Sequence, residues 1–292
     1  MRIASWSWGG RHHVGTISPC GREATPLALA DARMSADAGA LPLIEGWARG
    51  EAMPPPSGAR LPVDAITLRA PLPQPRRSLL CVGRNYRAHA AELAGTVFSA
   101  SLPKEDIWPI VFTKFAECVV GPHDAVRLPG DAVSSQIDYE CELAVVIGRG
   151  GRDIARSRAM DHVFGYTVVN DVSARDVQVR HLQWDLGKSF DTFCPMGPWI
   201  VTADELDGRD TRLRGWVNGE LRQDGLTKDM IFDIPTLIET CSRGITLYPG
   251  DVIATGTPSG VGMGFTPPRW LKAGDVVRVE IDGIGVIENR FQ

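Results

Sequence analysis

Short apolar runs, separated by Gly, Pro and Asp, recur along the chain from residue 110 to its end. Residues 138–148 and 163–170 are the clearest of these runs. Both are rich in β-branched side chains and therefore predict buried strands. Residues 247–253 and 271–277 each place a Gly-Asp turn before an apolar run, which predicts a turn that leads into a strand. The pattern as a whole favours a β-rich α/β fold with mixed strands.

Helical patterns are few and short, and they predict helices over residues 86–93, 157–161, 174–182 and 234–242. The first 70 residues differ from the rest, with a helix-like segment at 40–50 and a turn-rich link at 54–58. A Pro-rich stretch at 71–75 then precedes a buried run at 78–83. We therefore expect a small N-terminal domain over residues 1–70 and a main domain over residues 71–292.

Composition supports a folded chain of 292 residues that is 43% hydrophobic and 23% charged. The net charge of −4 gives no electrostatic reason to expect nucleic acid or an anionic membrane as a partner. No signal peptide is recognisable, and no apolar run reaches the ~18 residues that could span a bilayer. The six cysteines are scattered without a Cys-x-x-Cys pair. We expect free thiols and a cytoplasmic protein.

Three carboxylates are the first candidates for chemistry. Glu140 and Glu142 stand two apart at the start of a predicted strand, so they point to one face beside an apolar core. Asp171 directly follows the second predicted strand. Carboxylates that are buried this close need a neutralising partner. Three carboxylate ligands without His or Cys suit Mg²⁺ or Mn²⁺; the alternative is that the acids pair with Arg or cap turns.

His89 and Glu92 form a second candidate pair. On the predicted helix they lie at i and i+3 and share a face. A carboxylate beside an imidazole orients the ring, which suits a general base acting on water. The same spacing is also common for a pair of exposed surface residues.

Basic and amide side chains supply further candidates. Lys188 stands in an aromatic, Gly-rich loop and could stabilise a developing negative charge, although it could also simply pack its stem on the rings. Arg175 and Gln178 lie one helical turn apart. An Arg there could clamp a substrate carboxylate, or pair with Asp176 or another acid of the protein.

A Gly-rich loop at residues 254–264 follows a predicted strand. It is neither a Walker A motif nor a Rossmann fingerprint. Two interpretations remain: the backbone closely approaches a small anion, or the glycines form a cluster of tight turns.

Five segments in order resemble the fumarylacetoacetate hydrolase family: residues 83–92, 138–143, 170–176, 188–195 and 255–262. The likeness is to its branch of acylpyruvate hydrolases and 2-hydroxyhepta-2,4-diene-1,7-dioate isomerases, and the first 70 residues carry no matching motif. The resemblance implies a mixed β-sandwich roll behind a small N-terminal domain, usually as a homodimer.

The same resemblance implies a role for each candidate residue. Glu140, Glu142 and Asp171 match magnesium ligands. His89 and Glu92 match a dyad that activates water, and Lys188 matches a lysine beside the metal. The positions that match substrate contacts are Arg84, Arg175, Gln178 and Thr257.

The expected activity is that of a metal-dependent hydrolase in aromatic catabolism. It would cleave a C–C bond in a 2,4-dioxo acid, an acylpyruvate such as fumarylpyruvate, to pyruvate and a carboxylic acid. Alternatives on the same site are an oxaloacetate decarboxylase, a 2-oxo-heptenedioate isomerase, a dehydratase or hydrolase of sugar-derived 2-oxo acids, and a catalytically decayed metal-binding protein. We expect residues 93–108 and 265–270 to select the acyl tail.

Overall fold

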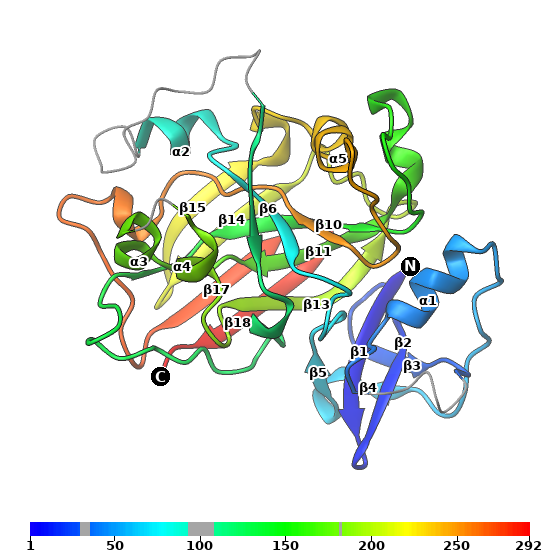
Figure 1. The fold of residues 1–292 in the computed structure, drawn as a ribbon. Coiled ribbons are helices and arrows are strands. Elements are labelled where there is room, and N and C mark those ends of the chain that lie inside the picture. The colour runs from blue at the N-terminus through cyan, green and yellow to red at the C-terminus, as the bar shows by residue number, and fades with distance from the viewer. Residues whose placement is uncertain (30–35, 93–107, 181–182) are drawn as a thin grey trace.

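A mixed sheet of twelve strands and a second sheet of four strands form the body of the molecule (Figure 1). The computed structural model describes residues 1–29, 36–92, 108–180 and 183–292. The main path of the large sheet is β4-β3-β2-β1-β13-β11-β10-β16-β6-β7, with β5 on β1 and β8 on β13. The small sheet has the order β15-β14-β17-β18. The β-rich α/β sandwich expected from the sequence is confirmed.

The N-terminal part joins the large sheet, because β1 runs antiparallel to β13. In Figure 1 its strands, in blue, lie at one end of the molecule. Its elements are β1 (Arg2–Trp8), β2 (Arg11–Ile17), β3 (Glu23–Pro26), α1 (Leu41–Ala48), β4 (Leu61–Pro62), the 3₁₀ helix η2 (Val63–Ala65) and β5 (Thr67–Arg69). The domain boundary at residue 70 stays a prediction.

The central strands of the large sheet are buried on both faces, which explains their unbroken apolar runs. The remaining strands of this sheet are β6 (Leu79–Gly83), β7 (Ile110–Lys114), β8 (Val119–Val120), β10 (Cys141–Ile147), β11 (Val163–Asn170), β13 (Cys194–Thr202) and β16 (Val252–Ala254). A separate short pair consists of β9 (Ile137–Asp138) and β12 (Ser173–Ala174).

The small sheet packs one face on the large one, so its strand β17 alternates buried and half-buried positions. Leu143 and Val145 of β10 share a core with Leu213 and Val279 of this sheet. Ala144, which lies between them on β10, belongs to a second core on the opposite face of the sheet. The strands of the small sheet are β14 (Arg212–Val217), β15 (Glu220–Leu226), β17 (Val276–Ile281) and β18 (Gly285–Arg290).

Most of the predicted helices are present in the described residues. They are α2 (Arg87–Glu92), α3 (Arg175–Arg180) and α5 (Ile234–Ser242). The ends predicted at 93 and at 181–182 lie outside the described residues. Asp233 caps α5 by accepting from the backbone N–H of Thr236 at 3.0 Å. The other 3₁₀ helices are η4 (Ala116–Cys118), η5 (Arg156–His162), η6 (Thr227–Asp229) and η7 (Gly262–Gly264).

The helix expected at 157–161 is confirmed as the 3₁₀ helix η5. One local prediction is wrong. The loop expected around Lys188 contains a short helix, α4 (Asp185–Lys188). Its first residue, Asp185, accepts a 2.9 Å hydrogen bond from the backbone N–H of Thr113 on β7, so tertiary contact stabilises a turn that Gly187 would weaken by itself.

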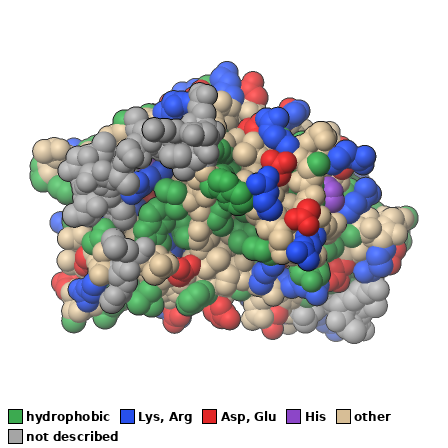
Figure 2. All heavy atoms as spheres, turned by 45° about the horizontal axis from the view of Figure 1, so that its top comes forward, with side chains coloured by type: hydrophobic (Ala, Val, Ile, Leu, Met, Phe, Trp, Pro, Cys, Tyr) green, Lys and Arg blue, Asp and Glu red, His purple; other side chains and the backbone are tan. Residues whose placement is uncertain are grey.

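Surface and cysteine features complete the picture. All six cysteines are free in the structure, as expected. Within the described ranges, every helix is too short or too polar to cross a membrane. On the face shown in Figure 2, basic and acidic side chains are interspersed on one half, while hydrophobic side chains gather nearer the middle.

Candidate active site

Two adjacent strands bring the three predicted carboxylates together. Glu140 and Glu142 flank Cys141, the first residue of β10, which pairs with Asn170 at the end of β11. Asp171 therefore lies beside Glu140, and its backbone N–H donates to the Glu140 carbonyl at 2.9 Å. One oxygen of each carboxylate lies within 4.8 Å of the others, and all three residues are buried. Their convergence is confirmed; their role as metal ligands stays a prediction.

Basic side chains already neutralise two of these acids. Lys188 Nζ lies 2.7 Å from Glu140 Oε2 and 2.8 Å from Asp171 Oδ2. Lys114 Nζ lies 2.8 Å from Asp171 Oδ1 and also donates to the backbone carbonyl of Lys188. Sequence reasoning missed Lys114, which stands in an ordinary strand pattern on β7. Lys114 is fully buried. Its partner Asp171 lies far away in the sequence, so only the folded structure shows the pair.

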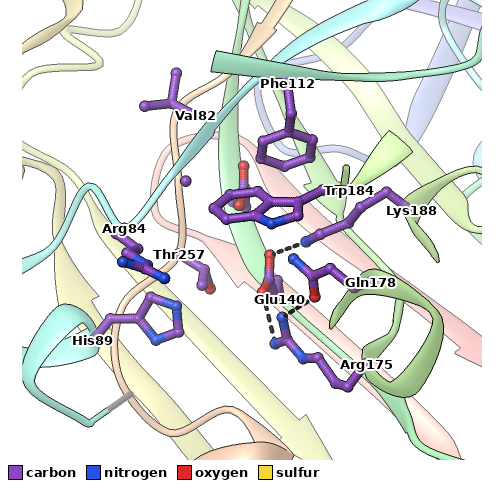
Figure 3. Close-up of a pocket in the computed structure, with 12 residues that line it drawn as sticks. Val82, Arg84, His89, Phe112, Glu140, Arg175, Gln178, Trp184, Lys188 and Thr257 are labelled. Atoms are coloured by element: carbon purple, nitrogen blue, oxygen red, sulfur yellow. Dashed lines mark hydrogen bonds and ion pairs between the residues drawn. The ribbon is translucent and has the colours of Figure 1, made fainter. Parts of the chain in front are cut away.

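Arg175 binds acids of the protein itself. Its Nη2 lies 2.7 Å from Glu140 Oε1, and its Nε lies 2.9 Å from Asp138 Oδ2. Its Nη1 donates to Gln178 Oε1 at 3.1 Å, one helical turn away, as the spacing predicted. Figure 3 shows Arg175 and Lys188 pointing toward Glu140, with Gln178 beside Arg175. The alternative in which acids pair with basic residues therefore holds for Glu140.

Glu142 differs from its neighbours. Among the described residues it has a hydrogen bond from the backbone N–H of Gly256 at 3.0 Å, and no Lys or Arg pairs with it. Burial, followed by the charges of Asp171 and Glu140, raises its pKa well above the usual range. Burial would also raise the pKa of Glu140, but Lys188 and Arg175 outweigh it and hold that pKa well below normal. A divalent cation would supply the missing positive charge at Glu142, so the donor set fits Mg²⁺ or Mn²⁺.

The predicted dyad is present on α2. His89 Nδ1 lies 3.0 Å from Glu92 Oε2, and Glu92 Oε1 accepts from the backbone N–H of Gly260 at 2.9 Å. Glu92 thus connects the imidazole to the Gly-rich loop. His89 and Arg84 lie on the side of the pocket opposite Lys188 and Gln178 (Figure 3).

Most of the candidate residues line one cavity. Its wall consists of Val82, Gly83, Arg84, His89, Phe112, Glu140, Glu142, Arg175, Gln178, Trp184, Lys188 and Thr257. Asp171 and Glu92 are connected to this wall through their contacts with Lys188 and His89. The aromatic rings of Phe112 and Trp184, which sequence reasoning missed, make an edge contact at 5.2 Å. Lys188 Nζ lies 5.1 Å from the Phe112 ring centre, so the charged end of this buried side chain also contacts an aromatic ring.

The Gly-rich loop binds anions of the protein itself. The backbone N–H groups of Gly262 and Met263 donate to the two oxygens of Asp138, at 2.6 and 3.1 Å. Those of Gly256 and Gly260 donate to Glu142 and Glu92. These four donors are therefore occupied by carboxylates of the protein itself, and a close approach of the loop to a small external anion stays a prediction. Asp138 is a fourth buried acid that sequence reasoning missed, although it begins the same predicted strand.

Comparisons with known proteins agree with this geometry. The family model described as fumarylacetoacetate (FAA) hydrolase C-terminal matches residues 78–292. The oxaloacetate tautomerase YisK of Bacillus subtilis (strain 168) is 51% identical over 230 residues, which cover 78% of this chain and 74% of the relative. The human mitochondrial oxaloacetate tautomerase FAHD2A is 48% identical over 233 residues, which cover 79% and 71%.

Solved structures extend the likeness over the whole chain. A 2-hydroxyhepta-2,4-diene-1,7-dioate isomerase from Mycobacterium marinum has a TM-score of 0.79 and 34% identity, covering 100% of this chain and 98% of its own. A maleylpyruvate hydrolase from Sphingobium sp. SYK-6, in complex with manganese(II) and pyruvate, has a TM-score of 0.78 and 33% identity, with coverage of 100% and 98%.

Proposed function

The chain belongs to the fumarylacetoacetate hydrolase family, and on that premise we propose that it is a metal-dependent enzyme that interconverts the keto and enol forms of oxaloacetate. Two relatives that share about half of their aligned residues with it are named oxaloacetate tautomerases. These names favour oxaloacetate over an acylpyruvate as the substrate. The motifs alone suggested oxaloacetate only as a substrate for decarboxylation.

The observation that carries the proposal is the buried carboxylate cluster with Glu142 lacking a basic partner among the described residues. Glu140, Glu142 and Asp171 would hold Mg²⁺ or Mn²⁺ through oxygen atoms. When bound, such an ion supplies Lewis acidity toward the 2-oxo group of the substrate. Manganese(II) is present in the related maleylpyruvate hydrolase structure.

The fixed charges of the site suit a dianionic substrate. Four buried acids face three buried bases, so with a divalent cation the set carries one positive charge; its members are Asp138, Glu140, Glu142, Asp171, Lys114, Arg175 and Lys188. Arg84 on the cavity wall adds another positive charge. Oxaloacetate, with two carboxylates, matches this excess of positive charge.

Tautomerisation moves one proton between C3 and the 2-oxo oxygen, and His89 and Lys188 act on the substrate directly. Glu92 accepts from His89 Nδ1 and so fixes the ring, which leaves Nε2 to take and return the proton. Lys188, kept charged between Glu140 and Asp171, stabilises the negative charge that develops on the 2-oxo oxygen.

The test uses oxaloacetate prepared in its enol form, with the purified chain and Mg²⁺ or Mn²⁺. We expect faster conversion to the keto form and faster exchange of the C3 protons with D₂O, followed by NMR, without release of pyruvate. The His89→Ala variant should lose both effects while still binding Mn²⁺. If the enol decays at the same rate with and without the loaded protein, the tautomerase proposal is wrong.

A second function is supported by one specific observation. The His89–Glu92 pair is the arrangement that activates water, and the related maleylpyruvate hydrolase contains pyruvate in its structure. Hydrolysis of an acylpyruvate would release pyruvate and a carboxylic acid. Assays with acetylpyruvate and fumarylpyruvate test this, and pyruvate plus CO₂ from oxaloacetate would indicate a decarboxylase instead.

A further inference from the structure

The Gly-rich loop is pressed against strand β15 of the small sheet. Gly260 has a φ of +105°, and a Cβ placed there would lie 1.8 Å from the carbonyl oxygen of Arg222. A Cβ on Gly225 would lie 2.6 Å from Pro258 Cβ. Such close approach is possible because these positions lack side chains. The site loop and the second sheet therefore meet backbone to backbone.

Gln223 lies on β15 within this contact and is completely buried. Its Oε1 accepts from the backbone N–H of Cys141 at 2.9 Å. Its Nε2 donates to Thr257 Oγ1 at 2.8 Å and to the Pro258 carbonyl at 2.8 Å. The side-chain amide thus uses its acceptor oxygen and both of its N–H donors on atoms around the carboxylate cluster.

Cys141 is the residue between Glu140 and Glu142. On one side it pairs with Asn170 of β11, whereas the pairing of β10 with β16 begins only at Ala144. At Cys141 the open edge of β10 is therefore covered by side chains. Gln223 binds its N–H, and Thr257 Oγ1 donates to its carbonyl at 3.0 Å. These bonds close a ring through Gln223, Cys141 and Thr257.

We propose that Gln223 is a positioning residue. It holds the two glutamates in the orientation that binds the divalent cation, and it holds Thr257 in the orientation that contacts the substrate. Gln223 touches neither glutamate, so its effect passes through the backbone of Cys141, whose orientation decides where both carboxylates point. The inference rests on the cation site of the proposed function.

The experiment measures Mn²⁺ binding to the metal-free full chain, by calorimetry and by the electron paramagnetic resonance spectrum of bound Mn²⁺. Gln223→Met keeps the side-chain size but leaves the Cys141 N–H and the Pro258 carbonyl without their partner. We expect roughly 10- to 100-fold weaker Mn²⁺ binding and an altered spectrum. A loss of packing alone would leave the spectrum of bound Mn²⁺ unchanged.

Asn289→Leu is the matched control. Asn289 is also a buried amide of the small sheet, but its Nδ2 donates to the carbonyls of Gly121 and Asp124, away from the Gly-rich loop. It should lower the melting temperature while leaving Mn²⁺ affinity and spectrum unchanged.

The outcomes separate this inference from the proposed function. If the unaltered chain binds no Mn²⁺, the cation site itself fails, and the inference falls with it. If the unaltered chain binds Mn²⁺ and Gln223→Met binds it equally well with the same spectrum, only the role of Gln223 is overturned. If Gln223→Met does not fold, Gln223→Glu, which keeps the shape and the acceptor but loses the amide donors, decides by the same two measurements.

Discussion

Lys188 and Lys114 approach Asp171 from its two oxygens, and Lys188 also binds Glu140. Such a desolvated network is strong while complete, because each buried charge keeps a partner, and removing one member leaves another unpaired. The two lysines differ in position: Lys188 lines the cavity, whereas Lys114 lies behind it. We therefore assign charge stabilisation to Lys188 and support of Asp171 to Lys114.

Replacing Lys188 by Met should lower the rate of oxaloacetate tautomerisation by roughly 100- to 1,000-fold, the usual cost of losing one preorganised charge-stabilising group. The ligand carboxylates remain, so Mn²⁺ should still bind. Enol decay and Mn²⁺ titration on the same preparation check both parts. A variant with unimpaired turnover would exclude Lys188 from the chemistry.

The raised pKa of Glu142 predicts that stabilisation of the protein by the cation depends on pH. Its folded-state pKa is raised, so between the ordinary carboxyl pKa and the raised value the folded protein holds a proton that the unfolded chain has released. The metal-free protein therefore loses stability as pH rises through that window, and a cation that displaces the proton binds better. We expect the Mg²⁺-induced increase in melting temperature to grow from about pH 5 to about pH 8.

The lowered pKa of Glu140 affects stability only at more acidic pH, because its stabilisation is present above the ordinary carboxyl pKa and is lost as the pH falls below it.

The Glu142→Gln variant is the control for the pH dependence that we expect from Glu142. It should melt higher than the unaltered chain without metal at about pH 8 and should gain little from Mg²⁺. An unchanged Mg²⁺ response in this variant would contradict Glu142 as a ligand.

At the scale of elements, the Gly-rich loop connects parts of the site that lie far apart in the chain. Its backbone N–H groups donate hydrogen bonds to Glu92 of α2 and to Glu142 of β10. Asn85, just before α2, donates from Nδ2 to the Thr255 carbonyl at 2.8 Å. The position of the His89 dyad therefore depends on the same loop as the carboxylate cluster. A disturbance of the loop should reach both.

Gly260→Ala tests this dependence. Its Cβ would overlap the Arg222 carbonyl, so the loop must shift and carry the Glu92 anchor with it. We expect a large fall in turnover together with a lower melting temperature. Gly219→Ala is the control: Gly219 also has a positive φ, of +81°, but its Cβ meets nothing within 4 Å. The control should cost about 1–2 kcal/mol of stability and leave turnover intact. Equal losses of turnover would contradict the coupling.

At the scale of the whole molecule, the N-terminal part shares a core with the main sheet. Ile3 and Ile44 belong to the same buried cluster as Ala144, Val146 and Phe164. Ala144 and Val146 lie on β10, which carries Glu142. The N-terminal part thus covers one face of the strand that holds the site.

A chain of residues 71–292 alone should therefore fold poorly, because the apolar face covered by the N-terminal part would be exposed to water. We expect aggregation or a broad, low melting transition, measured by circular dichroism and light scattering against the full chain. A truncated protein that melts as sharply and as high as the full chain would show that residues 71–292 fold without residues 1–70.

The features that depend on local spacing could be predicted before the fold was known. The two-residue period of a strand puts Glu140 and Glu142 on one face, and the helical period puts His89 beside Glu92. The order of five motifs over the main part of the chain identified the family, and the fold followed from it. These features were accessible because periodicity and motif order are written in neighbouring residues.

The distant groups that neutralise and position the acids became visible only in the folded chain. Lys114 faces Asp171, Asp138 faces Arg175, and Gln223 of the second sheet holds Cys141. Nothing in the spacing of these residues signals a partner, because each contact joins elements that lie far apart in the sequence and meet only in the folded chain. The N–H groups of the Gly-rich loop follow the same rule: the glycines left open whether the loop approaches an anion, and the fold places carboxylates of the protein's own chain against it.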